Sequence, residues 1–374
     1  MRGGSAAVRR RLREDNALVQ IDPDFWRRRR VLITGHTGFK GAWLSLWLRS
    51  LGADVSGLAQ GPPIRLSLYQ QARLAEEVHE HPVDVRDGAG VARAMLEAAP
   101  EVVIHMAAQP MVRRSLREPA LTYEVNVMGT VNVLEAVRAL GGGVAAVLVV
   151  TSDKCYAQNG SQAPFREGDP LGGGDPYSSS KAAAELVVAA YRSSYFSSAT
   201  STALATARAG NVIGGGDWGE DRLLPDVERA VAAGRPLAVR NPDAVRPWQH
   251  VLNPLGGYLQ LAEGLCRGEP LPPAVNFGPP PEDARPVRWI LQRLEELWEG
   301  RLQWVADVEG NPPEAMWLEL DSGIARERLG WRPRWDLDRA LREIVSWHRA
   351  HRAGEDMRRY SLLQLECFLA SPPL

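Results

Sequence analysis

The first hydrophobic run of the chain is short, and an amphipathic segment follows it. Residues 31–33 are apolar, and a glycine-rich stretch separates them from apolar positions that recur every three to four residues between Trp43 and Leu51. That spacing is the period of a helix, whereas a short apolar run bounded by glycine is typical of a buried strand. The pattern predicts a strand, a glycine-rich turn and a helix.

The same alternation continues through the first half of the chain. Further strands are predicted at residues 54–59, 83–85, 102–105 and 147–150, and further helices at 88–99, 120–140 and 177–196. Strands that alternate with helices at this spacing form a parallel sheet, because right-handed crossovers place helices on both of its faces. The predicted fold class is therefore α/β, a doubly wound parallel sheet of the Rossmann type.

The composition changes after about residue 210. The chain becomes rich in Pro, Gly and Trp, and its helical stretches become shorter, as at 287–298. We expect a dinucleotide-binding domain over 26–210, to which about 251–265 return, and a smaller, mainly substrate-binding lobe over 211–350. The first 25 residues are predicted to be a disordered extension and residues 351–374 a C-terminal tail.

The glycine-rich turn carries the first chemical signal. Gly35, Gly38 and Gly41 form GxxGxxG directly between the predicted strand and helix. Glycines at this place permit a tight turn and let a pyrophosphate approach the free amides at a helix N-terminus. The glycines alone fit an ordinary turn equally well, so the flanking strand and helix are what favour dinucleotide binding.

The carboxylate that often binds the adenosine ribose is missing from the second predicted strand. Its end, residues 57–59, has no acidic side chain, so the preference for NAD or NADP does not follow from this position. Asp84, after the third predicted strand, is placed to accept from an adenine amino group, and an ordinary loop carboxylate is the equal alternative.

A tyrosine and a lysine stand four residues apart after Asp175-Pro176, where a helix can begin. Tyr177 and Lys181 therefore share one helical face. An ammonium group beside a phenol lowers the phenol's pKa, and a deprotonated tyrosine can act as a base. Such a pair is usually a solvated surface pair, but here it follows a strand whose carboxyl end carries the polar run 151–154, at the edge where open sheets bind ligands.

Charge and cysteine content exclude several classes of function. Lysine and arginine number 44 and acidic residues 45, so no electrostatic footprint for nucleic acid or an anionic membrane is expected. Cys155, Cys266 and Cys367 form no CxxC pair, which predicts neither a metal site nor a disulfide framework and fits a cytoplasmic protein. No apolar stretch reaches the length of a membrane span.

Several motifs together resemble a known superfamily. They are TGHTGFKG (34–41), HMAAQP (105–110), NVMGT (126–130), TSDKCY (151–156), PYSSSK (176–181), ARAGNVIGGGDW (207–218), RPWQHV (246–251), NFGP (276–279) and LGWRPRW (329–335). This set is similar to the extended short-chain dehydrogenase/reductase superfamily and, within it, to the nucleotide-sugar 4,6-dehydratases that act on CDP-glucose. The resemblance covers about residues 26–348.

The resemblance implies an NAD-dependent lyase that converts CDP-D-glucose to CDP-4-dehydro-6-deoxy-D-glucose. Tyr177 would take the proton of the 4-hydroxyl while Ser152 hydrogen-bonds that oxygen, with Lys181 beside them. Asp153 would protonate the departing 6-hydroxyl. Lys154 occupies the place where many relatives carry a glutamate base, and we expect it to remove the C5 proton. The alternative is that Lys154 only anchors a phosphate or carboxylate.

The resemblance and the position of residues after each strand give the remaining expected contacts. Expected cofactor contacts are Gly35, Thr37, Gly38, Phe39, Gly41, Asp84, Val85, Ala107, Ala108, Gln109, Asn126, Tyr177 and Lys181, and expected substrate contacts are Arg113, Ser115, Asn211, Arg246 and Arg285. Packing explains the alanines equally well, and Asn126 is expected to support the active-site backbone or a water. A single arginine is more often a solvated surface group.

Three alternatives stay open at this point. Another nucleotide-sugar dehydratase, or an epimerase or decarboxylase of the same superfamily, would also use Ser152, Tyr177 and Lys181. A non-catalytic sensor of the dinucleotide would need none of these side chains. The resemblance also implies a homodimer or a dimer of dimers, paired through the predicted helices 120–140 and 177–196.

Overall fold

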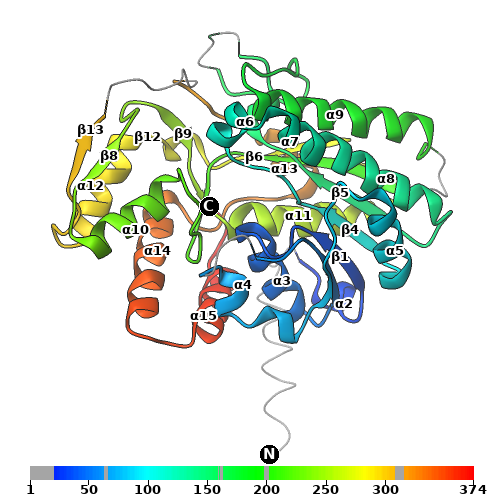
Figure 1. Ribbon diagram of the computed structural model, residues 1–374, viewed down its shortest axis with the longest axis horizontal. Coiled ribbons are helices and arrows are strands. Elements are labelled where there is room, and N and C mark those ends of the chain that lie inside the picture. The colour runs from blue at the N-terminus through cyan, green and yellow to red at the C-terminus, as the bar shows by residue number, and fades with distance from the viewer. Residues whose placement is uncertain (1–20, 63–65, 159, 161–162, 198–201, 308–315) are drawn as a thin grey trace, which may run out of the picture.

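A computed structural model describes residues 21–62, 66–158, 160, 163–197, 202–307 and 316–374 (Figure 1). Of the predicted disordered extension, residues 1–20 lie outside the described residues. Residues 21–25, in contrast, belong to the folded part: helix α2 (Pro23–Trp26) is capped by Asp22, and Trp26 is fully buried. The indole of Trp26 donates to Glu263 Oε1 at 2.6 Å, which ties the start of the fold to a distant helix.

The centre of the molecule is a seven-stranded parallel sheet in the order β11-β6-β5-β4-β1-β2-β3. Its strands are β1 (Arg30–Thr34), β2 (Asp54–Leu58), β3 (His79–His81), β4 (Val102–His105), β5 (Ala146–Val150), β6 (Ala203–Ala209) and β11 (Ala274–Phe277). The order reverses between β1 and β4, and ligands of open α/β sheets bind outside the carboxyl ends of the strands at such a reversal. The predicted α/β fold class is confirmed.

The third strand does not lie where the sequence predicted it. It spans His79–His81 rather than 83–85, pairs only with β2, and exposes much of its polar His-Glu-His sequence. An edge strand of this kind lacks the apolar run on which the prediction rested. Val85 instead joins the core cluster under the neighbouring helices, so Asp84 lies in a loop.

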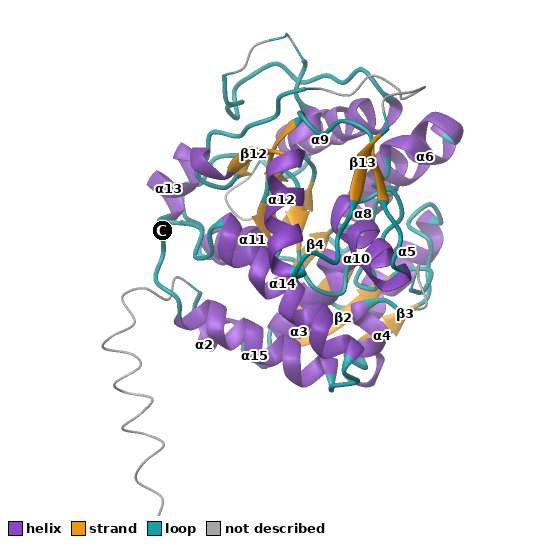
Figure 2. Ribbon diagram, turned by 90° about the vertical axis from the view of Figure 1, so that its left-hand side faces the viewer, coloured by secondary structure: helices purple, strands orange, loops and turns teal. Residues whose placement is uncertain are grey.

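Helices cover both faces of the sheet (Figure 2). On one face the core includes α3 (Phe39–Ser50), α11 (Leu252–Cys266) and α15 (Met357–Ala370), and on the other it includes α5 (Gly88–Ala98), α8 (Gly129–Ala139) and α9 (Pro176–Ser194). Adjacent strand residues separate accordingly, because side chains alternate along a strand: Ile33 joins the first core and Leu32 the second.

The predicted helix 120–140 is interrupted. It consists of α7 (Pro119–Tyr123), a π-helical turn η2 (Glu124–Met128) and α8. Single π turns inside helices are frequent at functional sites. This one carries the buried Asn126, which hydrogen-bonds the loop after β4.

A second group of elements packs around its own apolar cluster, beside the sheet in Figure 1. It contains α10 (Leu223–Ala233), α12 (Val287–Leu297) and α14 (Leu337–Arg352), with three strand pairs: β7 (Val212–Ile213) with β10 (Gln249–His250), β8 (Leu237–Val239) with β13 (Trp304–Ala306), and β9 (Val245–Pro247) with β12 (Ala284–Pro286). The remaining elements are α4 (Leu68–Gln71), α6 (Val112–Arg117), α13 (Gly323–Leu329) and the 3-10 turns η1 (Leu74–Glu76), η3 (Asp153–Cys155) and η4 (Pro281–Asp283).

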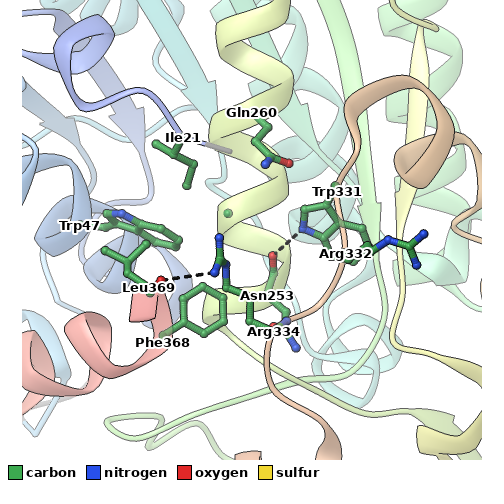
Figure 3. Close-up of a pocket in the computed structure, with 10 residues that line it drawn as sticks. Ile21, Trp47, Asn253, Gln260, Trp331, Arg332, Arg334, Phe368 and Leu369 are labelled. Atoms are coloured by element: carbon green, nitrogen blue, oxygen red, sulfur yellow. Dashed lines mark hydrogen bonds between the residues drawn. The ribbon is translucent and has the colours of Figure 1, made fainter. Parts of the chain in front are cut away.

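The C-terminal segment is integrated into the fold. Helix α15 packs against α3 through Phe368 and Trp47, and the Arg334 guanidinium donates to Leu369 O at 3.3 Å (Figure 3). The cavity beside these groups measures about 20 Å³. That is room for about one water molecule, so this place packs the C-terminus and holds no substrate.

Membrane-spanning helices and metal sites were searched for in the part of the chain that the structure describes. No helix within it is long and apolar enough to cross a membrane. No group of three or more His, Cys, Asp or Glu side chains within it could hold a metal ion. Cys155, Cys266 and Cys367 are all free cysteines.

Candidate active site

One large cleft runs from the carboxyl ends of the strands to the second group of elements. Its volume is about 910 Å³, at the upper end of the range for ligand sites. The glycine-rich turn after β1, the loops after β4 and β5 and the start of α9 line one side. Residues 209–213, 216–226, 237–241, 244, 246 and 248 line the other. The cleft therefore joins the predicted cofactor site to the predicted substrate lobe.

The residues of the glycine-rich turn fit a dinucleotide. Gly38 is the N-cap of α3, no side chain caps this helix, and the turn lines the cleft. The free amides of its first turn are an anion site of the kind that binds a pyrophosphate. Gly35 has φ 74°, and a Cβ there would lie 2.8 Å from the backbone of Ala107; a Cβ at Gly41 would lie 2.2 Å from Gly35 O. Gly35 lets the turn pack closely against the loop after β4, and Gly41 lets the helix α3 pack closely against the turn.

Most of the other predicted cofactor residues reach the cleft. They are Thr37, Phe39, Asp84, Val85, Ala107, Ala108 and Gln109. Asn126 does not line it: its Oδ1 accepts from the Gln109 amide at 2.8 Å and its Nδ2 donates to Gln109 O at 3.1 Å. Asn126 therefore fixes the backbone of a cleft residue, as expected for a support of the active-site backbone.

The part of the cleft around Asp84 is polar and ion-paired. Asp84 accepts from Gln60 Nε2 at 2.8 Å and from Arg86 Nη2 at 2.6 Å. The hydrogen bonds from Arg86 lower the pKa of Asp84 and keep it charged. A charged, half-exposed carboxylate at this position can still accept from an adenine amino group.

The polar run after β5 forms a compact cluster at the other end of the cleft. Ser152 caps the turn η3, and its Oγ accepts from the Lys154 amide at 3.2 Å and donates to Asp153 Oδ1 at 2.9 Å. Ser152 and Asp153 are buried, and Lys154 is half-buried. The three predicted residues face the same cleft as Tyr177 and Lys181.

Helix α9 brings the tyrosine and the lysine to this cluster. Asp175 caps the helix by accepting from the Ser178 amide at 2.9 Å, and Pro176 occupies its first position. Lys181 lies one turn after Tyr177 and donates to Val150 O, at the end of β5, at 3.2 Å. The lysine thus links the helix to the strand that carries the cluster.

The expected lowering of the pKa of Tyr177 by Lys181 is contradicted by the structure, in which this pKa is raised. Burial raises the pKa of Tyr177 to about 12, and the hydrogen bond with Ser152 and the charge of Arg222 oppose this rise. Burial also lowers the pKa of Lys181 to about 8, which Glu185 opposes. Arg222 is therefore one cation whose charge lowers the pKa of Tyr177, and burial weakens the charged form of Lys181 one helical turn further on.

Burial raises the pKa of Asp153, against the charge of Lys154, the hydrogen bond from Ser152 and the charges of Arg246 and Lys40. Asp153 Oδ2 is buried and has no hydrogen-bond partner among the described residues. A carboxyl in this environment favours its protonated form. It is suited to donate a proton to a substrate oxygen.

The predicted substrate residues divide into two groups. Arg113, Asn211 and Arg246 line the cleft. Ser115 does not: it is fully buried, and its Oγ accepts from the Tyr177 amide at 3.1 Å. Arg285 is exposed, is not part of the cleft lining, and stacks on Trp289. Ser115 therefore fixes the start of α9, and Arg285 lies outside the site.

The cleft residues that were not predicted from the sequence include three cations, Lys40, Arg222 and Arg240. Arg222 is ion-paired with Asp217 at 3.0 Å, and its charge acts on Tyr177. Burial, then the charges of Lys181 and Arg222, lower the pKa of Lys40 to about 7. Lys40 could have been predicted from the sequence, because it lies within the glycine-rich motif. No sequence pattern marks Arg222 or Arg240 as cleft residues.

Comparisons with known proteins cover most of the chain. A family model described as GDP-mannose 4,6 dehydratase matches residues 32–262. The CDP-glucose 4,6-dehydratase of Salmonella typhimurium is 47% identical over 342 residues, which cover 90% of this chain and 95% of that protein. Similarity of this extent covers both the sheet and the smaller group of elements.

Two solved structures share the fold. The UDP-glucose 4-epimerase of Thermus thermophilus, in complex with NAD, is 27% identical, has a TM-score of 0.71 and matches over 86% of this chain and 99% of its own. The dTDP-glucose 4,6-dehydratase of Streptomyces venezuelae, with NAD bound, is 24% identical, has a TM-score of 0.73 and matches over 88% and 99%.

Proposed function

Because this chain belongs to the GDP-mannose 4,6-dehydratase family, we propose that it is a nucleotide-sugar 4,6-dehydratase that acts on CDP-D-glucose. It eliminates water from the sugar and forms CDP-4-dehydro-6-deoxy-D-glucose, a precursor for deoxysugars. The 47% identity to a CDP-glucose 4,6-dehydratase supports the choice of substrate. The cluster Ser152, Asp153 and Lys154 beside Tyr177 supports the reaction.

The cofactor is NAD. The uncapped N-terminus of α3 would hold its pyrophosphate, and Asp84, which also lines the cleft, would accept from its adenine amino group. When bound, NAD takes up hydride from C4 of the glucosyl group and gives it back at C6. We assign cofactor binding to residues 26–210 with 251–265, and most substrate contacts to 211–350. Arg113, Asn211 and Arg246 are the candidates for the diphosphate.

Oxidation at C4 is the task of Tyr177. Its phenolate takes the proton of the 4-hydroxyl, and Ser152 holds that oxygen by a hydrogen bond. Lys181, fixed on Val150 O, supplies positive charge next to the phenol. The positive charge of the oxidised nicotinamide adds to that of Arg222 and lowers the phenol's pKa in the loaded site.

Elimination is the task of the turn η3. The C4 ketone acidifies the C5 proton, and Lys154 removes it while Asp153 protonates O6, which leaves as water. Lys154 returns its proton to C5 when C6 receives the hydride, so over a whole turnover Tyr177 gains one proton and Asp153 loses one. Ser152 contacts both groups, so a proton can pass from the phenol through its hydroxyl to the carboxylate and restore the site.

The observation that carries the proposal is the buried carboxyl of Asp153 next to the oxidation residues. An epimerase needs no acid to expel a 6-hydroxyl, and a cofactor sensor needs no phenolate. The test is to mix the purified protein with CDP-, dTDP-, UDP- and GDP-glucose and to measure the alkali-induced absorbance of a 4-keto-6-deoxy sugar. Signal with CDP-glucose without added reductant is expected. Cofactor binding with no product from any of the four would contradict it.

We propose further that two copies of the chain pair through α7, η2 and α9. Tyr123, Met128 and Leu186 on these elements are 39%, 50% and 61% exposed, which is unusual for large apolar side chains in one region. Sedimentation is expected to give a dimer or a dimer of dimers, and Leu186→Asp is expected to dissociate it. Three free cysteines fit a reducing compartment, and we place the enzyme in the cytoplasm.

A further inference from the structure

One arginine of the cleft has no role in the proposed reaction and carries a donor that nothing satisfies. Arg240 directly follows β8 and lines the cleft, and its side chain is 24% exposed. Its Nη1 is buried and has no hydrogen-bond partner among the described residues. A buried donor without an acceptor is costly, so each such group needs an explanation. A ligand that brings an acceptor into the cleft explains this one.

Asp221 holds the guanidinium group in place without using up its donors. Asp221 Oδ1 lies 3.9 Å from Arg240 Nη2, which is close enough for an ion pair and too far for a hydrogen bond. The same oxygen accepts from Arg113 Nη1 at 3.3 Å, and Arg113 belongs to α6. Asp221 is therefore anchored by Arg113, and both Nη groups of Arg240 can donate to a ligand.

The walls of this part of the cleft suit a flat base. Figure 1 shows β8 on the side of the second group of elements that faces away from the sheet. Of the parts of a nucleotide sugar, the base is the one with large apolar faces to cover. The sugar has to reach Tyr177, and the diphosphate has Asn211 and Arg246 as candidate donors, so the base is left for the apolar walls. The apolar residues that the second group contributes to the cleft include Leu237, Ala238, Val239, Ala244, Trp248 and Val287.

The donors of a guanidinium group match one edge of cytosine. Cytosine carries two adjacent acceptors, O2 and N3, and a guanidinium group presents paired N–H donors and no acceptor. Uracil and thymine carry an N–H group at N3, so one donor of the arginine would face another donor there. A site that hydrogen-bonds its ligand rejects an analogue that leaves a buried group unpaired.

Building on the proposed function, we propose that Arg240 selects the base of the substrate: its two Nη groups donate to O2 and N3 of cytosine and disfavour uracil and thymine. The base takes no part in the reaction. Arg240 is therefore a specificity-determining residue, and its contact strengthens the binding of the substrate and of the transition state alike.

The test compares Arg240→Met with the wild type on CDP-, UDP- and dTDP-glucose. The wild type is expected to have its highest kcat/KM with CDP-glucose. In the variant, kcat/KM with CDP-glucose is expected to fall about 10- to 100-fold, the range of a bidentate contact between an arginine and a base, and mostly through a higher KM. With UDP- and dTDP-glucose, kcat/KM should change less than about threefold, because the lost contact was not made with these bases.

A substrate analogue separates a base contact from a phosphate contact. In the 3-deaza analogue of CDP, a C–H group replaces N3, whereas the diphosphate is unchanged. As a competitive inhibitor it is expected to bind the wild type about 10-fold more weakly than CDP, and to bind Arg240→Met as well as CDP does.

A charge-conserving variant makes the same distinction. Arg240→Lys keeps the charge but not the paired donors, so it should lose the preference for CDP-glucose as Arg240→Met does. Arg288→Met is the control and should resemble the wild type, because it removes an exposed cation of the same group of elements from an ion pair with Asp243.

An unchanged preference for CDP-glucose over UDP-glucose in Arg240→Met would overturn the role of Arg240. So would an equal loss with all three nucleotides, or full activity in Arg240→Lys, since both indicate a phosphate contact. These results leave the proposed function standing, because the wild type still converts CDP-glucose. Absence of 4-keto product from the wild type with CDP-glucose would instead overturn the proposed function, and the role of Arg240 with it.

Discussion

Helix α9 and the turn η3 meet at the active site, and they differ in almost every physical respect. Helix α9 has 19 residues, a capped N-terminus and a buried ion pair between Glu185 and Arg208 of β6 at 2.7 Å. The turn η3 has three residues and is held by the hydroxyl of Ser152. In the proposed reaction, the helix carries Tyr177 and Lys181 for oxidation, and the turn carries the acid and the base for elimination.

The difference shows where the reaction type is encoded. The oxidation residues depend on a long element that is fixed to the sheet at several points, by Lys181 on Val150 O and by Glu185 on the side chains of Thr151, Thr206 and Arg208. The elimination residues are adjacent in sequence and depend on one short turn. We infer that changes in η3 alter the steps after oxidation, whereas changes in α9 stop the reaction at its first step.

Tyr177→Phe should have the largest effect of all. Without the phenolate no group takes the 4-hydroxyl proton, so product formation should fall toward the upper end of about 10²- to 10⁴-fold. The absorbance of the reduced cofactor should not appear at all. Tyr191→Phe is the matched control, because Tyr191 lies on the same helix but hydrogen-bonds Glu135 away from the cleft. Oxidation that survives in Tyr177→Phe would exclude Tyr177 as the base.

Asp153→Asn should separate the two elements most clearly. Oxidation should continue and reduced cofactor accumulate, while the loss of the acid lowers product formation by about 10²- to 10³-fold. Stopped-flow absorbance and product quantification measure the two steps. Asp243→Asn removes an exposed carboxylate from an ion pair with Arg288 and should behave like the wild type. A parallel loss of both steps would place Asp153 in the oxidation instead.

Lys154→Met should act on one step within the elimination. Product formation should fall by about 10²-fold, with C4 oxidation retained and no exchange of the C5 proton with deuterated solvent. Nuclear magnetic resonance of the recovered substrate and intermediate measures this exchange. Unchanged C5 exchange would show that Lys154 only anchors the substrate.

Arg208→Met should have the smallest effect on the balance between the two steps and test the rigidity of α9. Glu185 would remain buried without its guanidinium partner, which costs about 3–5 kcal/mol of folding free energy. Denaturant unfolding measures this loss. The ratio of product to oxidised intermediate should stay near that of the wild type at a temperature where the variant is folded, and a large change in that ratio would show that α9 also controls elimination.

Much of this arrangement could be predicted from the sequence, because a short, continuous apolar run indicates a strand buried on both faces and apolar positions at helical spacing indicate a helix. Residues 102–105 and 147–150 are fully apolar apart from His105, and both were predicted as buried strands. The edge strand His79–His81 could not be found this way, since polar side chains satisfy an exposed strand equally well.

The site residues form two groups: those near a predicted strand or helix end, and those that only the tertiary fold brings to the site. Ser152, Asp153, Lys154, Tyr177 and Lys181 each lie within a few residues of a strand end or helix start that the pattern predicted, and the resemblance of the motifs TSDKCY and PYSSSK supplied their expected roles. Ser115 also lies shortly after a strand, but closeness in sequence does not predict where a side chain points. Its hydroxyl faces the start of α9, where it accepts from the Tyr177 amide, and not the cleft. Arg222 approaches Tyr177 only through the tertiary fold, and no local pattern marks it.

The most direct test of the dehydratase proposal uses CDP-glucose that carries deuterium at C4. Since the hydride that leaves C4 is returned at C6 of the same sugar, we predict a 4-keto-6-deoxy product with the deuterium in its C6 methyl group, detected by nuclear magnetic resonance. Deuterium retained at C4 of an epimerised sugar, with no loss of water, would contradict the account.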